Sequence, residues 1–207
     1  MNYVKLLDGG IIDNYGLSGL VLRREESNLP YAPYTPQQAV KLRDLLFVVV
    51  DAGQAVDASW VKTVKGPSGV QLVLASTNTA LDAAKRVSFD LFTDTMDQWQ
   101  QQLITYRCGL SKEEVLRLRG SLDGWDCHDL QFHIARVTFG LLPPEQGKPL
   151  SLLPTTLALP TDQVDALIAG GEQALKRSPE YQDFLRSIGA TPQTASAVPV
   201  GAQPPVQ

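Results

Sequence analysis

An acid followed by two glycines lies near the start of the sequence, in VKLLDGGIIDNYGL (residues 4–17). Asp8 ends a short apolar run, and the pair Asp13-Asn14 comes soon after the glycines. A carboxylate that is partly removed from water and held about 2.6–3.2 Å from a hydroxyl can take the proton of that hydroxyl. The chemistry that this stretch offers is therefore general-base catalysis, and glycines beside the acid keep side chains out of the cleft.

The elements around the acid predict a β-α-β unit. Residues 1–7 predict a strand, so Asp8 would lie just beyond its carboxyl end, where open α/β sheets gather their ligands. The run LLFVVV (45–50), closed by Asp51, is typical of a strand covered on both faces in a parallel sheet. Between these runs, residues 35–38 (TPQQ) have the pattern of a capped helix start.

The middle of the chain predicts mostly helix and one further strand. Residues 77–106 contain neither proline nor glycine and predict one long helix or two. Ser111 begins a capping box that opens a short helix, which Gly120 ends. DLQFHIARVTFG (129–140) is rich in β-branched and aromatic residues and predicts a strand. We expect the proline-rich residues 141–160 to form an extended linker.

The last third predicts two helices and a tail. Thr161 is expected to cap the first helix, and the second starts at Ser178-Pro179-Glu180 and stops at Gly189. Its inward-facing side chains are expected to be Tyr181, Phe184, Leu185 and Ile188. Residues 190–207 lack charge and periodicity, which favours disorder. The sequence thus predicts an α/β domain over residues 1–189 with a disordered tail over 190–207.

The stretch LLDGGIIDNYGL resembles the second catalytic signature of the patatin-like phospholipases, an apolar strand followed by Asp-Gly-Gly or Asp-Gly-Ala and an asparagine-containing turn. The similarity to bacterial members spans most of residues 1–189 and includes FVVVDAG, FHIARVTFG and LPTTLALPTDQVDALIAGGEQAL. The resemblance implies part of a patatin-like α/β sandwich with a largely parallel sheet and a helical carboxyl-terminal region. It also implies hydrolysis of acyl esters, such as phospholipids or other lipids, by a serine-aspartate dyad without a histidine.

Carried onto this sequence, the resemblance assigns a role to four residues. Asp8 matches the dyad aspartate, which acts as general base. Gly9 and Gly10 match the small residues that let the loop backbone pass closely, and Asn14 matches the structural turn asparagine. The family also needs a Gly-x-Ser-x-Gly nucleophile elbow and a glycine-rich oxyanion loop before the Asp motif, and this sequence contains no Gly-x-Ser-x-Gly. We therefore expect the chain to need a serine from an upstream segment, and to be inactive and unstable or aggregation-prone without it.

Two other readings stay open at this stage. In the first alternative, the chain is a non-catalytic α/β remnant that binds a partner chain or lipid through an exposed half-core. In the second, it is an unrelated α/β domain whose Asp-Gly-Gly is only a turn. Ser18, in Gly16-Leu17-Ser18-Gly19, has the wrong spacing for an elbow and follows the acid too soon. The stretch GPSG (66–69) fails in the same way and predicts a turn.

Other residues whose side chains could take part in catalysis or binding are expected to have structural roles. Asp51 is expected to cap a turn or helix, and Asp13 to order the loop beside Asp8. His128 and His133 have no partner at metal spacing and predict surface or packing histidines. Cys108 and Cys127 are the only cysteines; they show no metal spacing, and unpaired thiols are favoured over a disulfide. The aromatic residues Trp60, Phe89, Phe92, Trp99 and Trp125 favour core packing over an acyl-chain pocket or a membrane-facing patch.

Composition excludes several function classes. The formal net charge is -4 and basic residues do not cluster beyond pairs, which argues against a nucleic-acid partner. No dinucleotide fingerprint, phosphate loop or zinc spacing occurs, so neither a cofactor nor a metal is expected. The expected partners are a lipid or other acyl ester substrate and the upstream segment, with peripheral membrane contact as a further expectation. The sequence leaves the compartment open.

Overall fold

The computed structural model describes residues 13, 15–53, 59–62, 64, 66–156 and 158–191. The chain divides into two compact units. The first unit comprises Met1–Phe47 and Pro67–His133, and the second comprises Val48–Gly66 and Ile134–Gln207. The predicted strand over residues 1–7 lies outside the described residues, as do residues 192–207 of the predicted tail.

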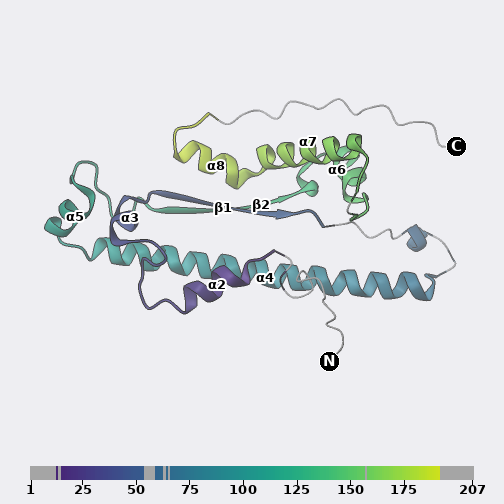
Figure 1. The fold of residues 1–207 in the computed structure, drawn as a ribbon, viewed down its shortest axis with the longest axis horizontal. Coiled ribbons are helices and arrows are strands. Elements are labelled where there is room, and N and C mark those ends of the chain that lie inside the picture. The colour runs from purple at the N-terminus through teal and green to yellow at the C-terminus, as the bar shows by residue number, and fades with distance from the viewer. Residues whose placement is uncertain are drawn as a thin grey trace. The chain divides into compact units, whose positions relative to one another are not determined.

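The described strands form one parallel pair, β1 (Asp44–Asp51) and β2 (Gln131–Thr138), drawn as arrows in Figure 1. The register starts where the Gln131 N–H donates to the Arg43 carbonyl at 2.7 Å. Both strands were predicted from their apolar runs, and both are confirmed. Together with the helices they make a mixed arrangement that is compatible with the predicted α/β class.

The two strands differ in how they are buried. In β2 the side chains of His133, Ala135 and Val137 are buried in strict alternation, the pattern of a strand with one covered face. In β1, Val49 is buried while Val48 and Val50 are 43% and 66% exposed. The expectation that β1 is covered on both faces is therefore wrong at the carboxyl end of the strand. Val48 and Val50 lie on the same face, because alternate residues of a strand share one face, and this face is open to solvent.

Capping boxes start three helices of the first unit. The described helices of this unit are α2 (Ser18–Glu25), α3 (Pro36–Lys41), α4 (Gly69–Cys108) and α5 (Lys112–Arg119). The predicted boxes at Thr35 and Ser111 are confirmed, and Ser68 forms a third one that opens α4. The predicted long helical region is a single helix of 40 residues, since nothing within it breaks the backbone hydrogen bonding. Gly120 ends α5 in the left-handed conformation, with φ of 88°.

The core of the first unit follows one stripe of α4. The buried residues of this helix are Phe92, Met96, Trp99, Leu103 and Arg107, at helical spacings of three and four. Phe92 also meets Phe47 of β1 edge to face, with ring centroids 5.3 Å apart. A second cluster joins α3 to α5 through Val40, Val115 and Leu118. The stripe therefore covers only the second half of α4.

The second unit is helical around the end of β2. Its helices, among the described residues, are η1 (Ser59–Lys62), η2 (Phe139–Leu141), α6 (Pro144–Ser151), α7 (Thr161–Arg177) and α8 (Pro179–Ser187). The core cluster is formed by Val137, Leu142 and Ala174. The predicted extended linker over residues 141–160 is wrong, because α6 forms within it. Pro144 occupies the first turn of α6, where a missing N–H costs nothing.

The ends of α7 and α8 agree in part with those predicted from the sequence. Thr161 was expected to cap α7 but is its first helical residue, and the cap position is Pro160, which makes no side-chain bond. Ser178 caps α8 as predicted, accepting from the Tyr181 N–H, and Gly189 follows with φ of 71°. Of the four side chains expected to face inward from α8, three are partly buried, and the fourth, Ile188, is 50% exposed.

Candidate functional site

The four residues of the predicted catalytic motif lie outside the described residues. These are Asp8, Gly9, Gly10 and Asn14. Their roles stay predictions, and the structure describes the chain that continues from them, beginning with Asp13.

Asp13 organises the turn that leads into α2. Its carboxylate accepts two backbone N–H groups, from Leu17 at 3.1 Å and from Ser18 at 2.8 Å. Gly16 makes the turn itself, with φ of 67°. Burial alone would raise the pKa of Asp13, but the hydrogen bonds from Ser18, Leu17 and Gly16 together hold this pKa below its usual value. The prediction that Asp13 is a turn or cap residue is confirmed.

Ser18 belongs to that cap and not to a nucleophile elbow. It is the first residue of α2, it is exposed, and its N–H is bound by Asp13. A nucleophilic serine needs a sharp strand-to-helix turn and backbone N–H groups left free for the oxyanion. Ser18 follows a turn and not a strand among the described residues, and its own N–H is bound by Asp13.

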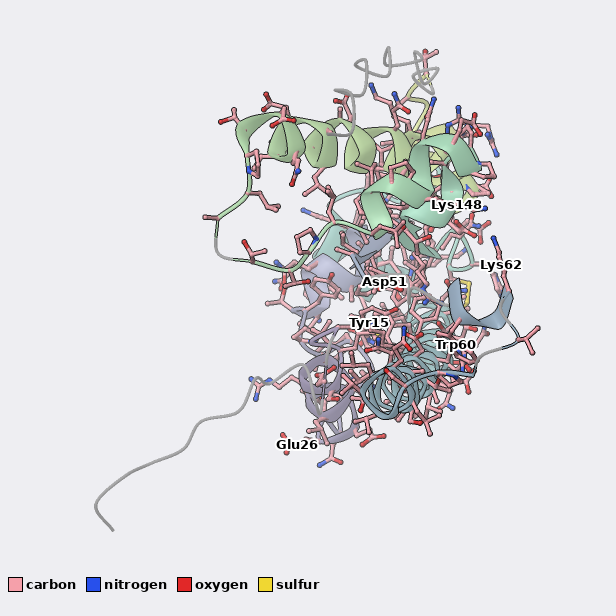
Figure 2. The ribbon with its side chains drawn as sticks, turned by 90° about the vertical axis from the view of Figure 1, so that its right-hand side faces the viewer. Tyr15, Glu26, Asp51, Trp60, Lys62 and Lys148 are labelled. Carbon is pink, nitrogen blue, oxygen red and sulfur yellow. A yellow bond between two sulfur atoms is a disulfide. The ribbon has the colours of Figure 1, made fainter. Side chains whose placement is uncertain are left out.

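Asp51, labelled in Figure 2, is the last residue of β1, and both of its carboxylate oxygens are engaged. One oxygen lies 2.9 Å from Arg136 Nη2, and the other accepts the Gly53 N–H at 3.1 Å. Its side chain is only 12% exposed. Asp51 thus stabilises the strand end and the following turn, as the sequence predicted.

The two histidines occupy different environments in the first unit. His133 is buried in β2, and its Nε2 lies 3.4 Å from Asp44 Oδ1. His128 is exposed in the loop before β2. These positions confirm the predicted packing and surface roles, although His128 has neighbours that the sequence did not reveal.

Arg107 is a buried cation that sequence reasoning missed. Its guanidinium donates to the carbonyls of Leu42 at 2.7 Å and Asp126 at 3.0 Å, and pairs with the Asp129 carboxylate. It also lies 4.9 Å from the centroid of the Trp125 ring. Burial lowers the pKa of Arg107, and the charge of Asp129 opposes this effect. One feature of the sequence could have predicted the burial of Arg107: it lies four residues after Leu103, on the apolar stripe of α4.

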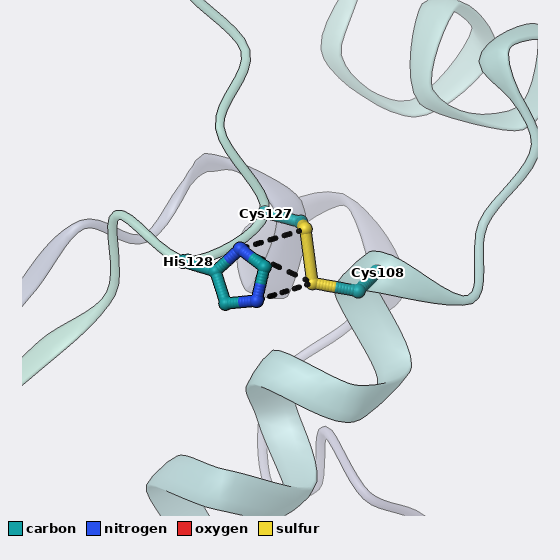
Figure 3. A group of neighbouring side chains, drawn as sticks. All are labelled: Cys108, Cys127 and His128. Atoms are coloured by element: carbon teal, nitrogen blue, oxygen red, sulfur yellow. Dashed lines mark hydrogen bonds between the residues drawn. A yellow bond between two sulfur atoms is a disulfide. The ribbon is translucent and has the colours of Figure 1, made fainter.

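Cys108 and Cys127 form a disulfide, so the prediction of unpaired thiols is wrong (Figure 3). The bond joins the last residue of α4 to the loop before β2. The spacing of the two cysteines did not reveal the disulfide, because α5 and the left-handed turn at Gly120 lie between them and bring the loop back to the end of α4. His128 lies beside the bond: its Nδ1 is 3.3 Å from Cys127 Sγ, and its Nε2 is 3.7 Å from Cys108 Sγ.

Aromatic residues mostly build the core, as predicted. Trp99 is buried. Its ring centroid lies 5.1 Å from that of Phe132 and 5.6 Å from that of Tyr34, on which it stacks. Phe92 is fully buried. The other three predicted aromatic residues, Trp60, Phe89 and Trp125, are partly buried.

A polar hollow of about 310 Å³ lies beside α2 and α4 in the first unit. Its lining includes Arg24, Ser27, Asn28, Gln98 and Gln102. The Arg24 guanidinium is already engaged, because it donates to the carbonyls of Leu29 and Ala32 and to the Gln102 side chain. Such a lining suits polar groups and does not suit an acyl chain.

The described residues form a helix-rich arrangement with one parallel strand pair, which is compatible with the α/β class. Comparison of the chain with protein-family models, curated proteins and solved structures finds no match. The resemblance to patatin-like phospholipases therefore depends on the sequence motifs alone. Across the described part of the chain, none of the helices has the length and apolar character needed to cross a bilayer.

Proposed function

We propose that this chain is the carboxyl-terminal part of a patatin-like acyl hydrolase domain, with the α/β sandwich of that family. In this proposal Asp8 is the general base for a serine carried by a preceding segment, and the substrate is a lipid or another acyl ester. The observation that carries the proposal is the motif LLDGGIIDNYGL.

The structure supports the proposal at the exit from this motif. The Asp13 cap and the Gly16 turn give the chain a defined path into α2 directly after the predicted catalytic loop. A catalytic loop needs such an anchor, because a carboxylate acts as a base only when its position relative to the hydroxyl is held. The parallel direction of β1 and β2 is also compatible with the largely parallel sheet that the proposal expects.

In the proposed reaction the Asp8 carboxylate takes the proton of the serine hydroxyl as the oxygen attacks the ester carbonyl. Backbone N–H groups of the preceding segment would stabilise the oxyanion, and the protonated Asp8 then returns the proton to the leaving alkoxide. No histidine takes part. In this scheme His133, buried beside Asp44, and His128, beside the disulfide, keep structural roles.

The test is esterase activity of a longer protein that includes the preceding segment with its Gly-x-Ser-x-Gly. This protein should hydrolyse short-chain nitrophenyl esters, and Asp8→Asn should lower kcat by about 10²–10⁴-fold, the usual contribution of a positioned base. Asp162→Asn, an exposed change at the start of α7, is the matched control and should leave kcat unchanged. Full activity of the Asp8→Asn variant would refute the assignment.

A non-catalytic role as a binding remnant is the alternative, and one observation favours it. The first half of α4 exposes apolar side chains that a partner chain could cover, among them Val70, Leu72, Val73 and Leu74. This alternative predicts a folded 207-residue chain that co-purifies with a second polypeptide. It also predicts no esterase activity when the preceding segment is supplied.

A further inference from the structure

Two sulfur atoms and an imidazole gather at the end of α4 in the first unit. The donor atoms of Cys108, Cys127 and His128 all lie within 4.8 Å of one another. Cys108 and His128 are exposed and Cys127 is partly buried, so reagents in solution can reach the group. The proposed acyl transfer uses none of these residues.

The separations suit a tetrahedral metal ion once the disulfide is opened. Around zinc, with bonds of about 2.3 Å to sulfur and 2.0–2.1 Å to nitrogen, neighbouring ligand atoms lie roughly 3.5–3.8 Å apart. The Nδ1 of His128, the nitrogen that would bind the ion, already lies 3.3 Å from Cys127 Sγ and 3.9 Å from Cys108 Sγ. Only the two sulfurs, which are bonded to each other, must move apart.

The surrounding structure would keep the donors together without the covalent bond. Arg107 precedes Cys108 and binds the Asp126 carbonyl and the Asp129 carboxylate, on either side of Cys127 and His128. The Asp126 side chain accepts the His128 backbone N–H at 2.9 Å, which fixes the loop locally. Donors that are held before the ion arrives lose little conformational freedom on binding it.

We propose that reduction of the Cys108–Cys127 disulfide creates a zinc site in which both thiolates and the His128 imidazole bind one ion. This inference does not depend on the proposed esterase function. A dithiol supplies two electrons and two protons, leaving two cysteine thiols and a disulfide of the dithiol. Zinc then displaces the two thiol protons, and water completes the coordination. Oxidation by a small-molecule disulfide removes two electrons from the thiolates, reforms the Cys108–Cys127 bond and releases the ion.

The test uses cobalt(II) as a spectroscopic probe of the 207-residue chain, reduced with a phosphine under anaerobic conditions. We expect thiolate-to-cobalt charge-transfer absorption at one ion per chain, and its loss when zinc is added. The oxidised chain is the internal control and should give no such absorption, because it offers no thiolate. His128→Ala keeps both sulfurs but removes a direct ligand, and it should weaken zinc binding by more than about 100-fold, since even the loss of a group that only orients a ligand costs about 10–100-fold. Asp123→Ala changes an exposed acid in the same loop and should have no effect.

Circular dichroism of the reduced chain and of each variant checks that the helices are retained. Absence of thiolate-to-cobalt absorption in the reduced, folded wild-type chain would overturn the proposal. Equal zinc affinity of His128→Ala and the wild-type chain would also overturn it, as would binding of one ion by two chains.

Discussion

Arg107 and Asp129, 22 positions apart in the sequence, form an ion pair that ties the end of α4 to the loop before β2. The Arg107 side chain is 1% exposed and that of Asp129 is 19% exposed. Asp129 also binds Arg43, the residue before β1, through an Nε–Oδ2 contact of 2.7 Å. One carboxylate therefore joins three segments of the first unit: the start of β1, the end of α4 and the approach to β2.

Replacing Arg107 by methionine should destabilise the fold by about 3 kcal/mol, the lower part of the range for breaking a buried pair. The loss arises because the Asp129 charge and the carbonyls of Leu42 and Asp126 lose their shared donor. Arg117→Met, an exposed change on α5, is the matched control and should stay within about 0.5 kcal/mol of the wild-type chain. Urea unfolding of both variants measures the difference, and equal midpoints would show that the guanidinium contributes no stability.

Reducing the disulfide should lower the free energy of unfolding by about 3 kcal/mol, because the bond closes a loop of modest length in the unfolded chain. The sequence separation that it spans is 19 residues. Guanidinium unfolding with and without a phosphine reductant measures the change. A double variant, Cys108→Ala with Cys127→Ala, should not respond to the reductant. If reductant leaves the wild-type midpoint unchanged, the bond does not constrain the unfolded state.

Local signals in the sequence predicted much of the first unit. The boxes at Thr35 and Ser111, the left-handed Gly120 and the two apolar strands all depend on residues within a few positions of one another. Helix α6 was not predicted because its prolines were expected to hold the chain extended. Pro144 falls on the first turn, which tolerates it, and Pro149 lies inside the helix near its end.

The candidate sites also differ in how far the local sequence can predict them. A short motif is enough to propose Asp8 as a base, because the acid and its glycines are adjacent in the sequence. The group formed by Cys108, Cys127 and His128 could not be predicted in this way, since it depends on how α5 reverses the chain. Charge-pair partners such as Arg107 and Asp129 are likewise set by tertiary packing, which no local spacing encodes.

Protection of the turn before α2 should depend on pH through Asp13. Its pKa is lowered in the folded chain, so the charged carboxylate stabilises the fold above the unfolded-state value of about 4. This stabilisation should be lost as the pH falls through the lower folded-state value. Hydrogen exchange at the Leu17 and Ser18 amides measures it, with protection factors falling at acidic pH in the wild-type chain. Asp13→Asn keeps a neutral acceptor and should show no such fall; an identical fall would assign the effect to another group.

Gly147 of α6 packs so closely on η2 that an added methyl group cannot fit. A Cβ at this position would lie 2.2 Å from the Phe139 carbonyl oxygen, a backbone atom that cannot rotate away. We expect Gly147→Ala to destabilise the second unit by about 1–3 kcal/mol, the usual effect of overpacking. Gly171→Ala in α7 is the matched control, because nothing lies within 4 Å of its added Cβ. It should stabilise the helix by up to about 1 kcal/mol, since alanine favours helix more than glycine does. Thermal unfolding of both variants measures the two changes in stability. Shifts of the unfolding midpoint that have the same sign and size would contradict the close packing of α6 on η2.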